Sequence, residues 1–302
     1  MSGDAEQEYF SDGISEDVIT DLSKVSGLLV IARNSSFAYK GKSIDLRAVG
    51  RDLGVSTVLE GSVRKAGNRV RITAQLIDAA TGGHLWAERY DRDLTDIFAV
   101  QDEVTLSIVD ALKVALTPAE QARIADTGTS NLDAHDAIMR ARSLILSPNI
   151  NAEVFLRGVE CCERAVELDP NYAQAYAWLG ASNVMDHLNR WSDDPEGALA
   201  RGERLAARGV ELDPLDPYTH HAVAIIAMWS GKHELAAAAV EKALALDPNF
   251  ALALFTRGNI AIMGGRPKDA IPDIEHAMRL DPGFSQQHLH FLGLAHLLMG
   301  ND

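Results

Sequence analysis

Two groups of residues in this chain could do chemistry if their spacing allowed it: a short phosphate-loop-like segment and a set of histidines. Gly41-Lys42-Ser43 matches the end of a phosphate-binding loop. That loop needs a glycine five positions before Gly41, because only a glycine-rich turn lets backbone amides surround a phosphate. Ser36 stands there. The segment is therefore predicted to be an exposed loop that binds no nucleotide.

The histidines invite a metal-site hypothesis and occur as His220-His221, His288 with His290, and His296. A metal-binding pair on one helix needs a spacing of four residues, whereas adjacent histidines diverge by about 100° around the helix axis. None of these has that spacing within one helix. The acidic pairs Asp91 with Asp93 and Asp193-Asp194 fall at turns or strand ends without a partnering His or Lys. We expect no metal, no cofactor and no catalytic residue.

The cysteines, Cys161-Cys162, are sequence neighbours. A disulfide between adjacent residues would be badly strained, so both are predicted to be free thiols, which suits a reducing compartment. Their spacing fits no metal site. One of them falls on the inner face of a helix, where cysteine behaves as a small hydrophobic residue.

Charge and hydropathy exclude two classes of partner. The net charge is −15, with 14 basic and 20 acidic groups in residues 1–130 and 14 and 23 in residues 131–302. Neither half has the clustered basic groups that nucleic-acid binding requires. No apolar run approaches the roughly 18 residues that span a bilayer, and residues 1–6 lack the pattern of a secretion signal. We expect a cytoplasmic protein.

A tripeptide repeat dominates the second half of the chain. Leu-Asp-Pro ends at Pro170, Pro214, Pro248 and Pro282, and the last three prolines lie 34 residues apart. A fixed period of this length indicates an array of helix pairs that stack on one another, whose surface usually binds another polypeptide.

Small residues recur with this period: Ala224, Ala236 and Ala243 precede Pro248, and Gly258, Ala270 and Ala277 precede Pro282. They let two helices approach closely, and proline ends each pair. The pattern resembles the tetratricopeptide repeat over about residues 132–302. Ten extra residues separate Pro170 from Pro214, which predicts an insertion near 187–196. Ser147-Pro148-Asn149 interrupts the first repeat, and Pro272 should bend the helix that contains it.

In the resembling family, the second, fifth, ninth and twelfth residues of each repeat line a binding groove. Carried over to this chain, they are Gln174, Ala177, Ala181, Val184, Tyr218, His221, Ile225, Met228, Leu252, Phe255, Asn259 and Ile262. The lysine-asparagine clamp that some members use for a terminal carboxylate is absent, since Ala177, His221 and Phe255 occupy the relevant place. The resemblance implies a groove for an amphipathic helix or another domain. The alternative is that these residues only pack repeat on repeat or contact the N-terminal domain.

The first part of the chain has a different pattern. Helical spacing over Ile14–Val25 follows the turn Ser11-Asp12-Gly13, and the apolar run Leu28–Ala32 predicts a buried strand. A short helix ends at Gly54. Three strands are then predicted at Val55–Lys65, Arg69–Asp78 and His84–Tyr90, and a helix at Ile97–Leu112 is predicted to lie across the sheet. The fold class is an α+β domain, with a mixed sheet that includes an antiparallel meander, followed by an all-α solenoid.

Four segments of this domain are similar to a region of multidomain bacterial signalling proteins: 9–17, 30–35, 58–63 and 83–91. In that family the region resembles the amino-terminal domain of the TolB translocation protein. It lies between an output domain, most often a class III adenylate/guanylate cyclase, and tetratricopeptide repeats. No segment here resembles the cyclase catalytic domain. The family's first strand precedes the Ser-Gly-Asp that stands here as Ser2-Gly3-Asp4, so we expect it to be missing.

The predicted domains are residues 1–118, a helical connector at 119–131, and repeats at 132–302. A fifth repeat begins near Phe291 and has only its first helix, which predicts an exposed apolar helix face and possible self-association. The predicted function is a non-catalytic interaction region of a bacterial signalling protein that binds a protein, a peptide or another domain of its own chain. A winged-helix regulator and an envelope-associated scaffold are the alternative contexts.

Overall fold

The computed structural model describes residues 5–42, 45–124, 128–147, 150–283 and 286–300, and the side chains from residue 10 onward. The chain divides into two compact units, residues 1–127 with 278–285, and residues 128–277 with 286–302. Several predicted features lie outside the described residues, namely Ser2-Gly3-Asp4, Ser43, the start of the linker at Asp126-Thr127, and Pro148-Asn149.

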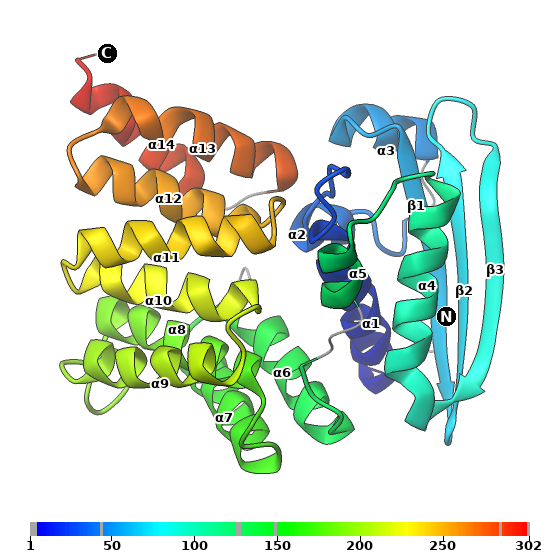
Figure 1. Ribbon diagram of the computed structural model, residues 1–302, viewed down its shortest axis with the longest axis horizontal. Coiled ribbons are helices and arrows are strands. Elements are labelled where there is room, and N and C mark those ends of the chain that lie inside the picture. The colour runs from blue at the N-terminus through cyan, green and yellow to red at the C-terminus, as the bar shows by residue number, and fades with distance from the viewer. Residues whose placement is uncertain (1–4, 43–44, 125–127, 148–149, 284–285, 301–302) are drawn as a thin grey trace. The chain divides into compact units, whose positions relative to one another are not determined.

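The first unit combines helices with an antiparallel sheet (Figure 1). Its elements are α1 (Ala5–Ser23), α2 (Arg33–Phe37), α3 (Leu46–Leu53), β1 (Thr57–Ala66), β2 (Arg69–Asp78), β3 (His84–Asp93), a 3₁₀ turn (Leu94–Asp96), α4 (Ile97–Ala111) and α5 (Pro118–Ile124). Among the described residues the strands form one three-stranded sheet in the order β1-β2-β3.

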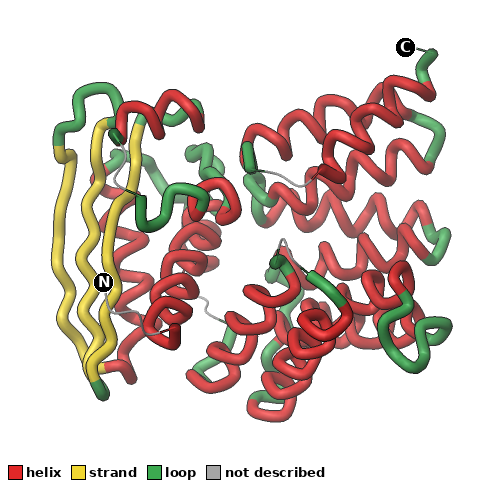
Figure 2. Tube along the Cα trace, turned by 180° about the vertical axis from the view of Figure 1, so that it is seen from behind, coloured by secondary structure: helices red, strands yellow, loops and turns green. Residues whose placement is uncertain are grey.

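The alternation predicted for β2 is confirmed. Val70, Ile72, Ala74 and Leu76 are buried, whereas Arg69 and Arg71 on the opposite face are exposed and form ion pairs with Asp91 of β3. Helix α4 places Ile97, Val100, Val104 and Ile108 in the core, as its stripe predicted. The helices α1 and α4 contact the strands, and Figure 2 shows them on one face of the sheet.

Both predicted hairpin turns are present. Gly67 lies between β1 and β2 with a φ of +59°, and Gly82 has a φ of +73°, a conformation that favours glycine. The Asp78 carboxylate accepts hydrogen bonds from the amides of Ala80 and Thr81. Gly54 ends α3 in the left-handed conformation, as its position predicted.

Two predictions for this unit were wrong. The run Leu28–Ala32 forms no strand, and the sheet is antiparallel throughout, so it is not mixed. Ile31 is buried but Leu29 is exposed, so this run buries only part of its apolar surface. The helix α1 also begins before Ser11-Asp12-Gly13 and runs through it, because a single glycine in a helix costs only about 1 kcal/mol.

The second unit is an array of antiparallel helix pairs (Figure 1). The pairs are α6 (Leu132–Ile145) with α7 (Ala152–Leu168), α8 (Ala173–Asn189) with α9 (Ala198–Leu212), α10 (Pro217–Trp229) with α11 (His233–Leu246), and α12 (Ala251–Met263) with α13 (Pro267–Leu280), followed by α14 (Gln286–Leu298). We call the first helix of each pair helix A and the second helix B. The helix α13 runs through Pro272.

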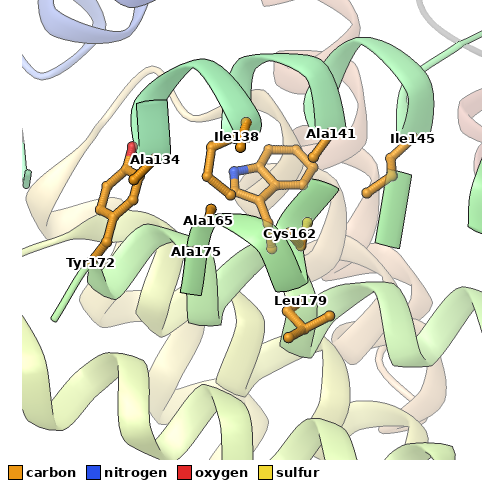
Figure 3. Packing of buried hydrophobic residues seen from close by; sticks show 11 residues of the cluster. Ala134, Ile138, Ala141, Ile145, Cys162, Ala165, Tyr172, Ala175 and Leu179 are labelled. Carbon is orange, nitrogen blue, oxygen red and sulfur yellow. The ribbon is translucent and has the colours of Figure 1, made fainter. Parts of the chain in front are cut away.

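The core of the first pair shows how the repeats pack. Figure 3 shows Ala134, Ile138 and Ala141 of α6 facing Cys162 and Ala165 of α7, with Leu179 of α8 beneath them. Cys162 is fully buried and Cys161 is partly exposed, so Cys162 takes the core position that the sequence predicted for one of the pair.

The predicted insertion lies between α8 and α9 and folds back on its own repeat. The carboxylate of Asp186, which is buried, accepts hydrogen bonds from the amide and hydroxyl of Ser192 and forms an ion pair with Arg201 at 3.3 Å. Trp191 packs against Phe155, with 5.0 Å between ring centroids. These contacts give the extra residues an ordered place beside the array.

Candidate protein-binding face of the A helices

The candidate site is the face formed by α8, α10 and α12, the A helices of three consecutive repeats. The helix α10 contacts α8 on one side of the array and α12 on the other. Neighbouring A helices lie side by side because α9 packs on both α8 and α10, and α11 packs on both α10 and α12. The twelve groove residues named from the sequence all lie on these three helices.

The twelve residues differ in how much of each side chain solvent can reach. The buried ones are Ala177, Val184, His221, Met228, Asn259 and Ile262. The half-buried ones are Gln174, Ala181, Tyr218, Ile225 and Phe255, and Leu252 is exposed. The buried members therefore hold the array together, and the other six provide the surface that a partner could touch.

The packing role is clearest between α8 and α10. Ala177 and Val184 belong to a cluster with Ala222 and Ile226 of α10, and Ile225 packs against it. The sequence left packing and partner binding as alternatives. Burial supports packing for Ala177 and Val184, whereas Ile225 is half-buried and can serve both purposes.

An aromatic row connects the repeats and was missed in the sequence. The Trp178 ring lies 5.8 Å from Tyr218, which lies 4.7 Å from Phe250. The Arg142 guanidinium lies 5.9 Å from the Trp178 ring and 5.8 Å from the Tyr218 ring, within reach of a cation–π interaction. The signal in the sequence was an aromatic residue in the first two turns of α8 and of α10 and one just before α12.

No residue of the twelve carries a formal charge near neutral pH. His221 is the member of this set whose imidazole gains or loses a proton according to its surroundings. Burial lowers the pKa of His221 to about 4, although a hydrogen bond to the Leu252 main chain opposes the shift. Its Nε2 lies 3.1 Å from the Thr256 hydroxyl. The nearby Arg142 is buried, so the twelve residues offer no accessible charge to a charged tail, and their composition favours an apolar partner.

Asn259 adds one polar group to this face. Its side chain is buried, and its Oδ1 atom accepts no hydrogen bond within the described chain. A buried acceptor without a donor costs roughly 1–3 kcal/mol. A donor on a partner, such as a main-chain N–H, would remove this cost.

Phe255 is committed to a neighbouring helix. Its ring stacks on His288 with 4.1 Å between centroids and meets Phe291 edge-on at 5.5 Å. Both residues belong to α14, so Phe255 attaches this last helix to α12. A substitution at Phe255 would therefore disturb the array as well as the face, whereas Leu252 is free of this difficulty.

Other candidate chemistry finds no support in the described part of the chain. No cluster of three metal-ligating side chains occurs there, and His220 contacts the Pro214 carbonyl at 2.8 Å. A hollow of about 380 Å³ between α6 and α7 is lined by residues that include Asp136, Arg140 and Cys161 and by none of the groove residues. None of the described helices combines the length and hydropathy needed to cross a membrane.

No protein-family model matches this chain. It is 52% identical over 229 residues to "Putative adenylate cyclase 3" of Rhizobium meliloti (strain 1021), a match that covers 76% of this chain and 39% of that protein. The chain thus spans only about two fifths of the length of this relative.

Solved structures with similar architecture include TTC0263, a thermophilic TPR protein of Thermus thermophilus. It is 18% identical with a TM-score of 0.44, covering 66% of this chain and 96% of that one. A crystal structure of MamA is 19% identical with a TM-score of 0.38, covering 49% and 81%. Since both TM-scores are low, the assignment of the second unit as tetratricopeptide-like rests on its own helix pairs and their spacing.

Proposed function

We propose that this chain is a non-catalytic protein-interaction region of a bacterial signalling protein and that it binds its partner through the A-helix face. The observation that carries the proposal is the composition of that face. Leu252 is exposed and Tyr218 and Ile225 are half-buried, all three are apolar or aromatic, and no formal charge lies among the twelve residues. An amphipathic helix or the surface of another domain has the chemistry to bind there.

The relative supports the signalling context. An identity of 52% over 229 residues with a protein named as a putative adenylate cyclase favours a cyclase as the parent protein over a winged-helix regulator or an envelope scaffold. The similarity of residues 9–17 and 83–91 to the TolB-like region of cyclase-linked proteins agrees with this context. A cytoplasmic location and the absence of catalysis belong to the same proposal.

Two measurements test the proposal. A photo-crosslinking amino acid at position 252 should capture a defined partner in bacterial cells, whereas the same group at Leu235, which is exposed on the B helix α11, should not. The purified chain, given ATP with Mg²⁺ or Mn²⁺, should form no cyclic AMP. Equal capture at both positions would contradict the binding face, and cyclic AMP formation would contradict the non-catalytic assignment.

A further inference from the structure

The sheet of the first unit has a second face, opposite the one on which α1 and α4 lie (Figure 2). Alternation along β2 directs Arg71 and Thr73 to this side. The residues that β1 and β3 place directly opposite them share the same side. We call this side the outer sheet face. Two adjacent rows across its strands are Arg64, Arg71 and Asp91, and then Ser62, Thr73 and Arg89.

Three arginines of this face share one carboxylate. The Asp91 carboxylate forms ion pairs with Arg69 at 2.8 Å, Arg71 at 2.7 Å and Arg89 at 3.4 Å. Hydrogen bonds from Arg69 and Arg71 hold the pKa of this carboxyl well below its usual range. The three arginine side chains nevertheless stay 57%, 50% and 58% exposed. A partner can therefore reach all three guanidinium groups.

Arg64 is the arginine that this carboxylate does not serve. The register places Arg64 directly opposite Arg71, and Asp91 lies on the far side of Arg71, two strand spacings or about 10 Å away. Arg64 is exposed and forms no ion pair with the residues that the structure describes. Like charges that face each other across a sheet destabilise it. A carboxylate from outside the chain would offset this repulsion by lying between the two guanidinium groups.

The neighbouring row supplies further donors. Ser62 and Thr73 are exposed and face each other across β1 and β2, and Arg89 is the partner of Thr73 on β3. Hydroxyl and guanidinium groups both donate hydrogen bonds to carboxylates. Glu60 lies one row further along and accepts a hydrogen bond from Gln75. The two rows thus combine several donors with a single carboxylate of their own.

The charge of the whole chain limits the kind of anion that fits this face. A net charge of −15 repels a long polyanion such as nucleic acid, and salt confines the attraction of the arginines to roughly 10 Å. The two rows also contain no aromatic side chain on which a base could stack. A short acidic segment of a protein avoids both difficulties, because its few carboxylates do not extend over the rest of the chain.

We propose that the outer sheet face binds a short acidic segment of a protein partner. One carboxylate of this segment lies between Arg64 and Arg71. A second lies beside Thr73 and Arg89. Arg71 keeps its bonds to Asp91 through Nε and one terminal nitrogen, and its other terminal nitrogen is available to the partner. This surface is separate from the A-helix face, whose residues all lie on α8, α10 and α12.

Fluorescence anisotropy with a labelled peptide tests the proposal. The probe is a peptide of alternating glutamate and serine, and its control has glutamine in place of each glutamate. The glutamate peptide should bind saturably below about 1 mM, and raising the salt from about 50 to about 300 mM should weaken binding at least about fivefold. The glutamine peptide should not bind. A single-stranded oligonucleotide of the same charge should bind more weakly than the glutamate peptide.

Two variants remove the same charge from different places. Arg64→Gln should weaken binding of the glutamate peptide at least about fivefold, because it removes the arginine that lacks a carboxylate. Arg51→Gln is the matched control and should leave binding unchanged, since Arg51 is exposed on α3 and lies outside the sheet. Arg64→Gln also removes a like-charge contact, so its Tm should not fall below that of the unmodified chain.

Four results would each overturn the proposal. They are an absence of saturable binding by the glutamate peptide, equal binding of the glutamine peptide, equal effects of Arg64→Gln and Arg51→Gln, and tighter binding of the oligonucleotide. In the last case the face binds nucleic acid and not an acidic protein segment.

Discussion

His221 and Thr256 join two consecutive repeats: the histidine Nε2 of α10 lies 3.1 Å from the Thr256 hydroxyl oxygen of α12. Both side chains are buried. The contact places a neutral imidazole inside the A-helix face, where a solvent-exposed histidine would be partly charged near its ordinary pKa. The same contact therefore stabilises the array and keeps the face uncharged.

His221 should make stability depend on pH between about 4 and 6.5. Burial lowers its pKa to about 4 in the folded chain, so in this window the unfolded chain binds a proton that the folded chain does not. The contribution is fully present above pH 6.5 and declines as the pH falls towards 4, by up to about 3 kcal/mol. Urea unfolding at several pH values measures it.

The matched variants for this test are His221→Gln and His220→Gln. The first should reduce the loss of unfolding free energy between pH 7 and pH 5. The second should retain that loss, because His220 contacts the Pro214 carbonyl and lies outside the buried contact with Thr256. Identical pH profiles for the two variants would show that His221 is not the responsible group.

Gly258 and Gly293 should respond in opposite ways to alanine. A Cβ atom at Gly258 would lie 2.7 Å from Ile274 Cγ1, and Ile274 is fully buried, so Gly258→Ala should lower stability by about 1–3 kcal/mol. A Cβ atom at Gly293 would meet no described atom within 4 Å, so Gly293→Ala should raise stability by about 0.5–1 kcal/mol, because alanine favours the helix. Denaturant titration at low protein concentration measures both, and effects of the same sign would contradict this packing.

The cysteines should react one at a time. Cys162 is fully buried and its burial raises the pKa of its thiol, so it should be inert in the folded chain. Cys161 is partly exposed and should react slowly with a thiol reagent, since its pKa is also raised by burial. Cys161→Ser should remove the folded-state reaction, and two reactive thiols in the folded chain would refute the core assignment of Cys162.

Asp21 should produce the reverse pH dependence in the first unit. Burial raises the pKa of Asp21 to about 6, although its ion pair with Lys24 opposes the shift. The folded chain therefore holds a proton that the unfolded chain releases, and stability declines as the pH rises from about 4 through 6, by roughly 3 kcal/mol at most. Asp21→Asn should remove this decline, and Asp12→Asn should keep it; calorimetric unfolding distinguishes them.

The fold was largely predictable because its elements have strong local patterns. The strand from Arg69 to Leu76 and the helix from Ile97 to Ile108 each bury one face. The spacing of their apolar residues reflects that one-sided burial, so it identifies each element from the sequence. Leu28–Ala32 was predicted wrongly for the opposite reason: a short apolar run can bury a side chain such as Ile31 without joining a strand.

The candidate site was only partly predictable. The repeat period placed the twelve residues on three consecutive A helices, but it could not show that Met228 and Ile262 are buried while Leu252 remains exposed. Burial depends on how adjacent repeats stack, and stacking depends on residues far apart in sequence. The aromatic row through Trp178 and Phe250 was missed for the same reason.

The most direct test of the binding face is a titration with a helical peptide. The peptide would be selected on the immobilised chain from a library of amphipathic helices, and its binding measured by fluorescence anisotropy. The A-helix face predicts that Leu252→Glu weakens binding at least about tenfold, while Leu235→Glu leaves it unchanged. Failure to select any helix, or equal binding by the two variants, would contradict the account.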